Sequence, residues 1–299
     1  MTHKYSYLSR TDPLYDEINK VCDEVHDFLK DLTTAILERV LANPSNTHEV
    51  TLLTLLMKLF YNLNYQDLHP KYEDNLGHWM EILKRVMKLE NTSEEVFKCK
   101  GAVLEVILLY ANKYKEDVQS TIQGFCEEIW GLSSTASENP EFDPIVLNSL
   151  KFFKSLLSWH EMKEFFTQHM SSLMSSLIIP NIRINKVAVG VFEDEPESFV
   201  DYYFRAAELN TRRSAALDLL RVICRSYQTF EPFIKEQIAN FLGMNERAPQ
   251  DECTILGLVI DGCSKGYRDV DGCTQLWVDV EVVNITYQNI VKPTLSRMY

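Results

Sequence analysis

Hydrophobic residues recur along most of the chain at spacings of three and four, which is the period of helices that bury one face. The clearest examples lie in Leu52–Leu63, Val146–Leu157 and Ala216–Tyr227. The first stretch is apolar on more than one face, so we expect it to contact helices on two sides. The pattern predicts an all-α protein.

Turn-forming residues interrupt this pattern at short intervals. Asn43–Asn46 precedes a helix expected near Val50–Leu63, and His69–Pro70 separates it from a helix near Asn75–Leu89. The run Asn91–Glu95 has the form of a helix cap followed by acidic residues in the first turn. We expect roughly a dozen helices of about 12 to 20 residues, joined by short turns.

Paired helices with short turns are typical of HEAT and armadillo arrays, whose repeats are about 40 to 47 residues long. We therefore predict an all-α HEAT-repeat superhelical solenoid of about six to seven helix pairs with one long insertion. The residue-level repeat is weak, so a globular helical domain is the main alternative fold. The predicted division is HEAT repeats over residues 1–177, an inserted acidic loop or hinge over 178–210, and further repeats over 211–299.

One connection is much longer than the others. About 30 residues separate a helix ending near Leu177 from one beginning near Thr211. Such connections are often functional, although an ordinary surface insertion is the alternative. A short helix is expected over Pro196–Leu209, and negative charge before it suits the helix dipole. We call the segment with three consecutive carboxylates the acidic run. It consists of Phe192, Glu193, Asp194, Glu195 and Pro196.

Two arginines open the helix that follows the insertion. Asn210 and Thr211 form a reasonable N-cap pair, and Arg212 and Arg213 come directly after them. Cations at a helix N-terminus oppose the helix dipole. We therefore expect these arginines to be held either by the carboxylates of the acidic run or by an incoming protein.

The last segment, from about Thr274, is rich in β-branched residues and could form a strand. We predict a helix instead, because its apolar positions keep the spacing of three and four. These positions are Leu276, Val280, Val283, Tyr287 and Ile290.

Composition limits the classes of function. Hydrophobic residues make up 45% of the chain, which is typical of a folded protein, and only 10 glycines argue against nucleotide-binding and all-β folds. The net charge of −13 disfavours nucleic acid and anionic lipid, and it suits either a basic protein partner or simple solubility. No stretch approaches the roughly 18 apolar residues of a membrane span, so we expect no membrane insertion.

The sequence contains no convincing catalytic or metal-binding set. His160–Glu164 begins like a zinc-protease motif but lacks the second histidine. Gly257–Ser264 has the glycine spacing of a phosphate loop, yet Cys263 stands where the lysine should be. The seven cysteines lack a Cys-x-x-Cys pair and mostly fall in apolar stretches, which fits free thiols in a reducing compartment. We predict no cofactor, no metal and no catalysis, with a helical enzyme as the least favoured alternative.

Two groups of segments resemble a known family. The first group is Lys58–Leu68, Tyr72–Asn75 and Trp79–Met80. The second group is Leu177–Asn181, Phe192–Glu197 and Asn210–Ala216, which is similar to an "IPN … FEDxP … DTRRRAA" insertion and its following helix. In order and spacing both groups resemble the CAS-type exportins, the importin-alpha re-exporters of the importin-beta superfamily. The resemblance extends from about Tyr5 to Arg297.

The resemblance implies a part in nuclear export. Members of the family wrap importin-alpha together with Ran in its GTP form, return importin-alpha to the cytoplasm, and shuttle through the nuclear pore past nucleoporins. Phe192–Pro196 and Thr211–Arg213 would belong to a hinge and partner contact. The matched region corresponds to the central part of the N-terminal arch, so we expect a fragment or partial gene product. A generic HEAT scaffold without Ran dependence is the alternative function.

Two departures from the family pattern concern arginines. Val200–Arg205 replaces an Ile-Arg-Arg-Asp-Leu-Glu pattern, and Ser214 occupies the position of the third arginine. Contacts made by those arginines in the family are therefore not expected in the same form here. A solenoid cut at both ends would also expose apolar faces, which predicts limited solubility or self-association.

Overall fold

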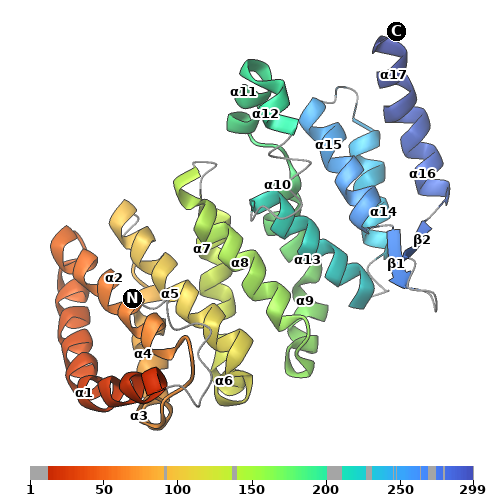
Figure 1. The fold of residues 1–299 in the computed structure, drawn as a ribbon. Coiled ribbons are helices and arrows are strands. Elements are labelled where there is room, and N and C mark those ends of the chain that lie inside the picture. The colour runs from red at the N-terminus through yellow and green to blue at the C-terminus, as the bar shows by residue number, and fades with distance from the viewer. Residues whose placement is uncertain are drawn as a thin grey trace. The chain divides into compact units, whose positions relative to one another are not determined.

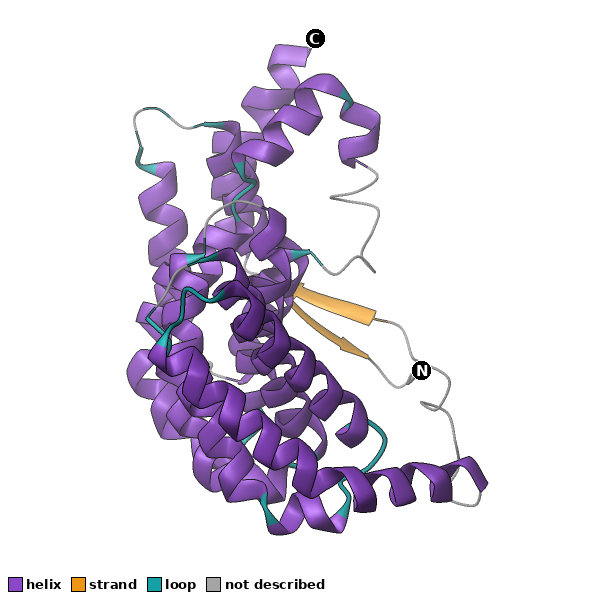
Figure 2. Cartoon of the chain, turned by 90° about the vertical axis from the view of Figure 1, so that its left-hand side faces the viewer, coloured by secondary structure: helices purple, strands orange, loops and turns teal. Residues whose placement is uncertain are grey.

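The computed structural model describes residues 13–90, 93–136, 140–200, 211–226, 231–244, 246, 248–262, 264–268, 274–278 and 280–298. Helices dominate these residues (Figure 1; Figure 2), and the predicted all-α class is confirmed. The chain forms two compact units, Met1–Thr135 and Ala136–Tyr299. The predicted division at residues 177 and 210 stays a prediction.

The first unit consists of helices followed by short turns. In order they are α1 (Pro13–Ala42), α2 (Thr47–Asn64), α3 (Pro70–Asp74), α4 (Leu76–Met87), α5 (Glu94–Lys113), α6 (Lys115–Ile122), the 3-10 turn η2 (Gln123–Phe125) and α7 (Cys126–Thr135).

Local sequence explains where several of these helices begin. Pro70 occupies the first turn of α3, and Nδ1 of His69 accepts a hydrogen bond from the backbone N–H of Lys71 in the same turn at 3.3 Å. The Oγ of Ser93 accepts the N–H of Val96 at 3.5 Å, and acidic residues follow in the first turn of α5. The predicted cap before this helix is confirmed.

Helix α2 contacts neighbours on two sides, as its broad apolar surface predicts. It packs against α1 and along α5, while α1 also contacts α3 and α4. Leu53 and Phe60 are fully buried by this packing. Leu52, Leu55 and Leu59 nevertheless remain exposed on the same helix.

The core of the first unit is built around aromatic rings. The ring of Phe60 stacks on Trp79 at a centroid distance of 4.2 Å and on Tyr110 at 6.0 Å, while His26 meets Tyr72 edge-on at 4.7 Å. All five side chains are buried. Such pairs each contribute about 0.5–1.5 kcal/mol beyond the area they bury. Three of these rings belong to the first group of family-like segments, so those segments encode core packing.

The second unit is also mainly helical. In order its elements are η3 (Pro140–Phe142), α8 (Asp143–Leu156), η4 (His160–Met162), α9 (Lys163–Leu173), the π-turn η5 (Met174–Ile178), α10 (Ile179–Ile182), α11 (Lys186–Asp194), α12 (Pro196–Val200), α13 (Arg212–Ser226), α14 (Glu231–Leu242), α15 (Pro249–Gly257), the π-turn η8 (Leu258–Gly262), β1 (Ser264–Arg268), β2 (Thr274–Val278), α16 (Val280–Thr286), the π-turn η9 (Tyr287–Val291) and α17 (Lys292–Met298).

Helix α13 has a central place in the second unit. It packs against α8, α10 and η8, while α15 lies beside α10 and η8. The periodic residues Ala216, Leu219 and Ile223 are fully buried, which confirms the predicted helical stretch over its described part.

The described part of the predicted long connection is mostly helical, and only Arg183–Asn185 and Glu195 lie outside its helices. The π-turn η5 continues α9 as far as Ile178, and three short helices, α10 to α12, follow. Phe192, Glu193 and Asp194 therefore end helix α11 and do not lie in an open loop. Helix α12 contains the first five residues of the helix predicted for Pro196–Leu209, and residues 201–210 lie outside the described part.

The prediction of a helix from Thr274 is wrong for its first residues. Thr274–Val278 forms β2, which pairs antiparallel with β1 so that Gly266 lies opposite Leu276 (Figure 2). β-branched and aromatic residues favour such a paired strand, and the spacing of three and four fits only the residues from Val280 onward. The helical prediction is correct for α16, η9 and α17.

None of the helices in the described part of the chain has the length and apolar character needed to cross a lipid bilayer.

Candidate functional site

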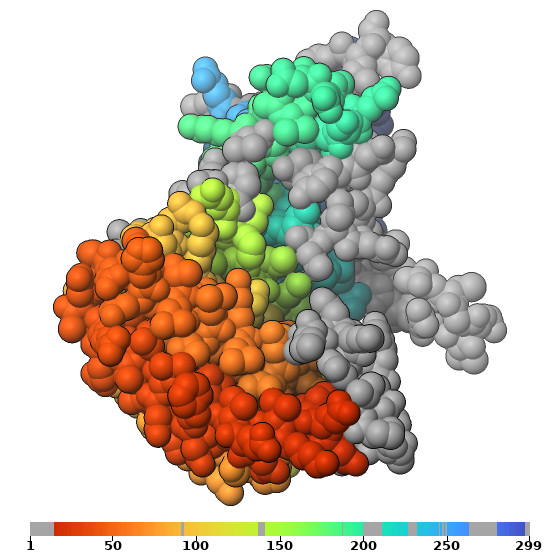
Figure 3. Space-filling view, turned by 60° about the vertical axis from the view of Figure 1, so that its left-hand side comes forward, coloured from red at the N-terminus to blue at the C-terminus, as the bar shows by residue number. Residues whose placement is uncertain are grey.

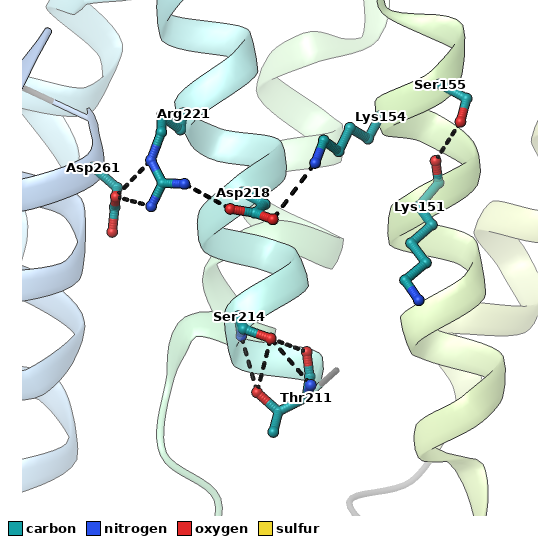
Figure 4. A network of polar contacts seen from close by, with 8 residues as sticks. All are labelled: Lys151, Lys154, Ser155, Thr211, Ser214, Asp218, Arg221 and Asp261. Carbon is teal, nitrogen blue, oxygen red and sulfur yellow. Dashed lines mark hydrogen bonds and ion pairs between the residues drawn. The ribbon is translucent and has the colours of Figure 1, made fainter. Parts of the chain in front are cut away.

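A reciprocal cap begins helix α13. The Oγ1 of Thr211 accepts the backbone N–H of Ser214 at 3.1 Å, and the Oγ of Ser214 accepts the N–H of Thr211 at 3.0 Å (Figure 4). This is the arrangement of a capping box, with serine in place of the usual glutamate. The predicted capping role of Thr211 is confirmed. The departure at Ser214 thus has a local structural role.

Arg212 is held by a carboxylate of another helix. Its Nε lies 2.5 Å from Oδ1 of Asp143, which begins α8, and the Arg212 side chain is only 12% exposed. The negative charge of Asp143 suits its own helix N-terminus and offsets the unfavourable position of Arg212 at the start of α13. The expectation of a carboxylate partner is correct, but the partner is not in the acidic run.

Arg213 is held by backbone carbonyls. Its Nη1 donates to the carbonyl of Ile182, the last residue of α10, and its Nη2 donates to the carbonyl of Cys253 in α15 at 3.2 Å. The free carbonyls at a helix C-terminus attract a cation. Burial lowers the pKa of Arg213, yet a guanidinium remains protonated at neutral pH. One side chain therefore joins three helices.

An ion pair between α15 and the residue that follows α10 lies beside the hydrogen bonds of Arg213. Arg183, directly after α10, places Nη2 3.0 Å from Oδ1 of Asp251 in α15. The other oxygen of Asp251 accepts the N–H of Ala248 at 3.1 Å and so caps the same helix. Asp251 therefore binds the residue that follows α10 with one oxygen and caps the start of α15 with the other.

Helices α11 and α12 have a small apolar core of their own. It consists of Ile184, Ala188 and Phe199, with Val189 and Cys253 packed against it. The contact with Cys253 attaches these short helices to α15. Burial raises the pKa of the Cys253 thiol, which keeps it protonated and apolar in character.

Close packing at Gly257 completes the base of the segment. A methyl group at this position would lie 3.1 Å from Cγ2 of Ile182 and 3.1 Å from Cδ2 of Leu217. Glycine therefore allows α15 to approach α10 and α13 closely. The surrounding stretch is helical, so the glycines at 257 and 262 do not form a phosphate loop.

The acidic run lies at the exposed end of α11. Phe192 is 51% exposed and contacts Phe199 edge-on at 5.2 Å. Glu193, Asp194 and Glu195 are exposed as well, and none of them forms an ion pair with another described residue. Figure 3 shows the surface of α11 and α12 in green. The structure brings Arg212 and Arg213 together with the base of the segment, and not with these carboxylates.

A row of charges links three helices next to this segment. Arg221 on α13 places Nη2 2.5 Å from Oδ1 of Asp261 and Nη1 2.6 Å from Oδ1 of Asp218, and Lys154 on α8 lies 3.5 Å from Asp218 (Figure 4). Burial alone would lower the pKa of Arg221, but the hydrogen bond to Asp261 and the two negative charges raise it. No sequence pattern pointed to this row, because Lys154 and Asp261 are far from Asp218 and Arg221 in the chain.

The arrangement of short helices and anchored arginines can position neighbouring helices and offer an exposed surface. Within the described ranges, no three His, Cys, Asp or Glu side chains gather closely enough to hold a metal ion. Buried arginines fix the base of the α10–α12 segment, while its end presents carboxylates and the ring of Phe192.

The fold and this segment define a helical-repeat protein with a candidate binding surface. Comparison with known families identifies it further, because the Cse1 family model matches residues 1–298. The chain therefore belongs to the Cse1 family.

Relatives and a solved structure support the assignment. The chain is 27% identical to Exportin-2 of Danio rerio over 306 residues, covering 95% of this chain and 31% of the relative. It is 26% identical to Exportin-2 of Homo sapiens over 315 residues, covering 98% and 32%. It is also similar to the structure described as "The exportin Cse1 in its cargo-free, cytoplasmic state", with a TM-score of 0.82, 21% identity, and coverage of 97% and 34%. That similarity confirms the predicted solenoid fold, and the chain spans about a third of the length of these proteins.

Proposed function

We propose that this chain is a segment of a nuclear export receptor that binds importin-alpha together with Ran in its GTP form. The receptor would return importin-alpha from the nucleus to the cytoplasm, and it would be present in both compartments. The observation that carries this proposal is the match of the Cse1 family model to residues 1–298. The chain acts by binding alone, and Ran itself hydrolyses the GTP.

The α10–α12 segment acts in this proposal as a hinge and partner contact. Phe192–Pro196 makes the contact, because these residues are exposed and their carboxylates form no ion pair with described residues. Complementary charge then requires a basic surface on the partner. In a solenoid, small rotations between neighbouring repeats add up to a large change of shape.

The start of α13 has an anchoring part in the same proposal. Arg212 and Arg213 are engaged with Asp143 and with two carbonyls, which leaves them little capacity to bind a partner directly. Thr211 fixes the helix start next to them. These residues would transmit movement of the α10–α12 segment to α13.

A capture experiment tests the function. Immobilised chain is incubated with importin-alpha in the presence of RanGTP, of RanGDP, or of neither, beside a version extended to the full length of the family. We expect importin-alpha to be retained only when RanGTP is present, either by this chain or by the extended version. Retention by the extended version alone would make the segment a hinge and spacer within the receptor. Ran-independent binding, or none in either version, would overturn the export proposal, and a Ran-independent partner would indicate a HEAT scaffold.

The acidic contact can be tested within the same system. Glu193→Gln, Asp194→Asn and Glu195→Gln together remove three charges from the exposed end of α11. We expect several-fold weaker binding of importin-alpha at low salt, with a smaller difference at high salt, because salt screens exposed charges.

The matched control removes the same charge elsewhere. Glu116→Gln, Asp117→Asn and Glu127→Gln lie at exposed positions of α6 and α7. This control should bind as the unmodified chain does. Equal losses in both triple variants would assign the effect to net charge and remove the contact role from the acidic run.

A further inference from the structure

The interior of the first unit contains polar atoms that have no hydrogen-bond partner among the described residues. They are Nε2 of His26, Oδ1 of Asn64, the hydroxyl of Tyr72, Nε1 of Trp79 and the hydroxyl of Tyr110. All five side chains are fully buried, and they come from α1, α2, α3, α4 and α5 in that order. Buried polar atoms are paired in the great majority of cases, so this group requires an explanation. We call these five atoms the buried polar cluster.

Ring contacts bring four of these side chains together. The rings of His26 and Tyr72 lie 4.7 Å apart between centroids, and the ring of Trp79 lies 6.3 Å from the first and 6.0 Å from the second. Phe60 joins Tyr110 to them, because its ring is 5.6 Å from Tyr72 and 6.0 Å from Tyr110. The unpaired atoms of these side chains therefore belong to one continuous part of the core.

Asn64 borders the same part of the core at the end of α2. Its Nδ2 donates to the carbonyl of Phe60 at 2.9 Å, while its Oδ1 has no donor in the described part of the chain. The backbone carbonyl of Asn64 accepts from the hydroxyl of Tyr114 at 2.6 Å, and the rings of Tyr114 and Tyr110 lie 5.1 Å apart. These contacts hold Asn64 next to Tyr110.

The buried polar cluster contains both donors and acceptors. Nε1 of Trp79 can only donate, and Oδ1 of Asn64 can only accept. Nδ1 of His26 lies 3.0 Å from Oδ1 of Asp27, so this nitrogen carries the proton of the neutral ring and Nε2 is an acceptor. A tyrosine hydroxyl can do both. A ligand that satisfies the cluster must therefore both donate and accept hydrogen bonds.

The same interior favours a neutral ligand. Burial raises the pKa of Tyr110 well above its usual value, and the neighbouring phenols of Tyr114 and Tyr72 raise it further. Burial also raises the pKa of Cys22, beside Tyr72, to about 11 and lowers the pKa of His26. These groups are uncharged at neutral pH, so an ion in the cluster would be left without a counter-charge. Complete enclosure by the five side chains also requires a small molecule.

Water has all of these properties, and buried waters typically make two to four hydrogen bonds to polar groups that lack other partners. We propose that internal water binds within the buried polar cluster and joins the hydroxyls of Tyr72 and Tyr110, which do not bond to each other. The water would link α3 to α5 in addition to their apolar packing. This proposal does not depend on the export function, since it requires neither importin-alpha nor Ran.

Oxygen-17 magnetic relaxation dispersion in labelled water tests the proposal directly, because it detects waters that exchange more slowly than the protein tumbles. The unmodified chain is compared with a variant that combines Tyr72→Phe and Tyr110→Phe, which keeps both rings and removes both hydroxyls. We expect the dispersion of the variant to fall by at least one bound water. Tyr65→Phe makes the same change at a ring that is 37% exposed and should leave the dispersion unchanged. An unchanged dispersion in the double variant, or an equal loss in Tyr65→Phe, would overturn the proposal.

Urea unfolding of the single variants gives an independent test. A hydroxyl that bonds to water loses that bond on replacement by phenylalanine, so Tyr72→Phe and Tyr110→Phe should each raise the equilibrium constant for unfolding several-fold. The double variant should lose less than the sum of the two, because both hydroxyls share a water. A hydroxyl buried without any partner predicts the opposite, since its removal relieves the cost of burying it. Variants at least as stable as the unmodified chain would therefore contradict the proposal, and so would strictly additive losses.

High-resolution diffraction from crystals of the unmodified chain requires no variant. We expect electron density for a water within hydrogen-bonding distance of the hydroxyls of Tyr72 and Tyr110. Side chains packed against each other in that place, with no such density, would rule out the internal water.

Discussion

Thr211 and Ser214 cap helix α13 for each other, since the N–H of each donates to the hydroxyl oxygen of the other at 3.1 Å or less. Replacing Thr211 by Val keeps the shape of the side chain but leaves the N–H of Ser214 without this acceptor. Loss of an N-cap costs about 0.5–2 kcal/mol. We expect a loss near the middle of that range in urea unfolding, with faster hydrogen exchange in the first turn of α13.

The pair can be separated from general threonine effects. Thr211→Val combined with Ser214→Ala should cost less than the sum of the single changes, because each removes part of the same reciprocal cap. Thr167→Val is a suitable control, because the exposed hydroxyl of Thr167 bonds to the Lys163 carbonyl within α9 and caps no helix start in the described structure. Strict additivity at positions 211 and 214 would mean that the two hydroxyls do not act together.

Arg213 should be the most sensitive position of the α10–α12 base. Arg213→Met retains much of the side-chain volume but removes the donors to the carbonyls of Ile182 and Cys253. Hydrogen bonds to charged groups contribute about 1.5–3 kcal/mol, and both part-buried carbonyls would lose the guanidinium donor. We expect a stability loss of about 2–3 kcal/mol, with increased exchange confined to α10, α15 and the start of α13.

The control for this prediction lies on the same helix. Arg225→Met changes the same residue type at an exposed position in the last turn of α13. Its effect should stay within about 0.5 kcal/mol. If Arg213→Met is equally mild, the anchoring role assigned to Arg213 is wrong.

The charge row of α8, α13 and η8 should respond unevenly to mutation. Asp261 is largely enclosed and accepts two hydrogen bonds from Arg221, so Asp261→Ala should cost about 1.5–3 kcal/mol. Asp218→Ala removes more exposed pairs and should cost about 0–1 kcal/mol. Thermal unfolding at low and high salt measures both, and only the Asp218 effect should fade as salt rises. The reverse order would place the main anchor of Arg221 at Asp218.

The parts of the fold that could be predicted from the sequence depend on residues close together in the chain. The caps at Ser93 and Thr211 each join residues three positions apart, so a short local motif is enough to predict them. The period of three and four succeeded for α13, where packing on both sides enforces it. The same period failed at Thr274–Val278. This segment forms backbone hydrogen bonds with β1, and the spacing of its own apolar residues does not indicate that pairing.

The candidate site was only partly predictable. The sequence indicated that Arg212 and Arg213 need partners, since both oppose the helix dipole. It could not identify Asp143, which is 69 positions before Arg212 in the chain. It also could not identify the acceptors of Arg213, because a backbone carbonyl carries no signature in the sequence.

Acid should destabilise the first unit through His26. This side chain is fully buried between α1 and the aromatic rings of Tyr72 and Trp79, and burial lowers its pKa. The charges of Lys30 and Lys71 lower it further, while the hydrogen bond and charge of Asp27 partly oppose the shift. The folded protein therefore binds the proton more weakly than the unfolded chain does.

The sign of the pH effect follows from this difference. An unfolded histidine takes up a proton below about pH 6.5, while folded His26 stays neutral, so the free energy of unfolding falls as pH decreases below that value. One such group contributes a slope of at most about 1.4 kcal/mol per pH unit until the folded pKa is reached. Urea unfolding followed by tryptophan fluorescence between neutral pH and pH 5 should show a shallower dependence of the free energy of unfolding on pH for His26→Phe than for the unmodified chain. His48→Phe, at an exposed position of α2, should leave the slope unchanged. Identical slopes for the unmodified chain and His26→Phe would show that His26 is protonated equally in the folded and unfolded states.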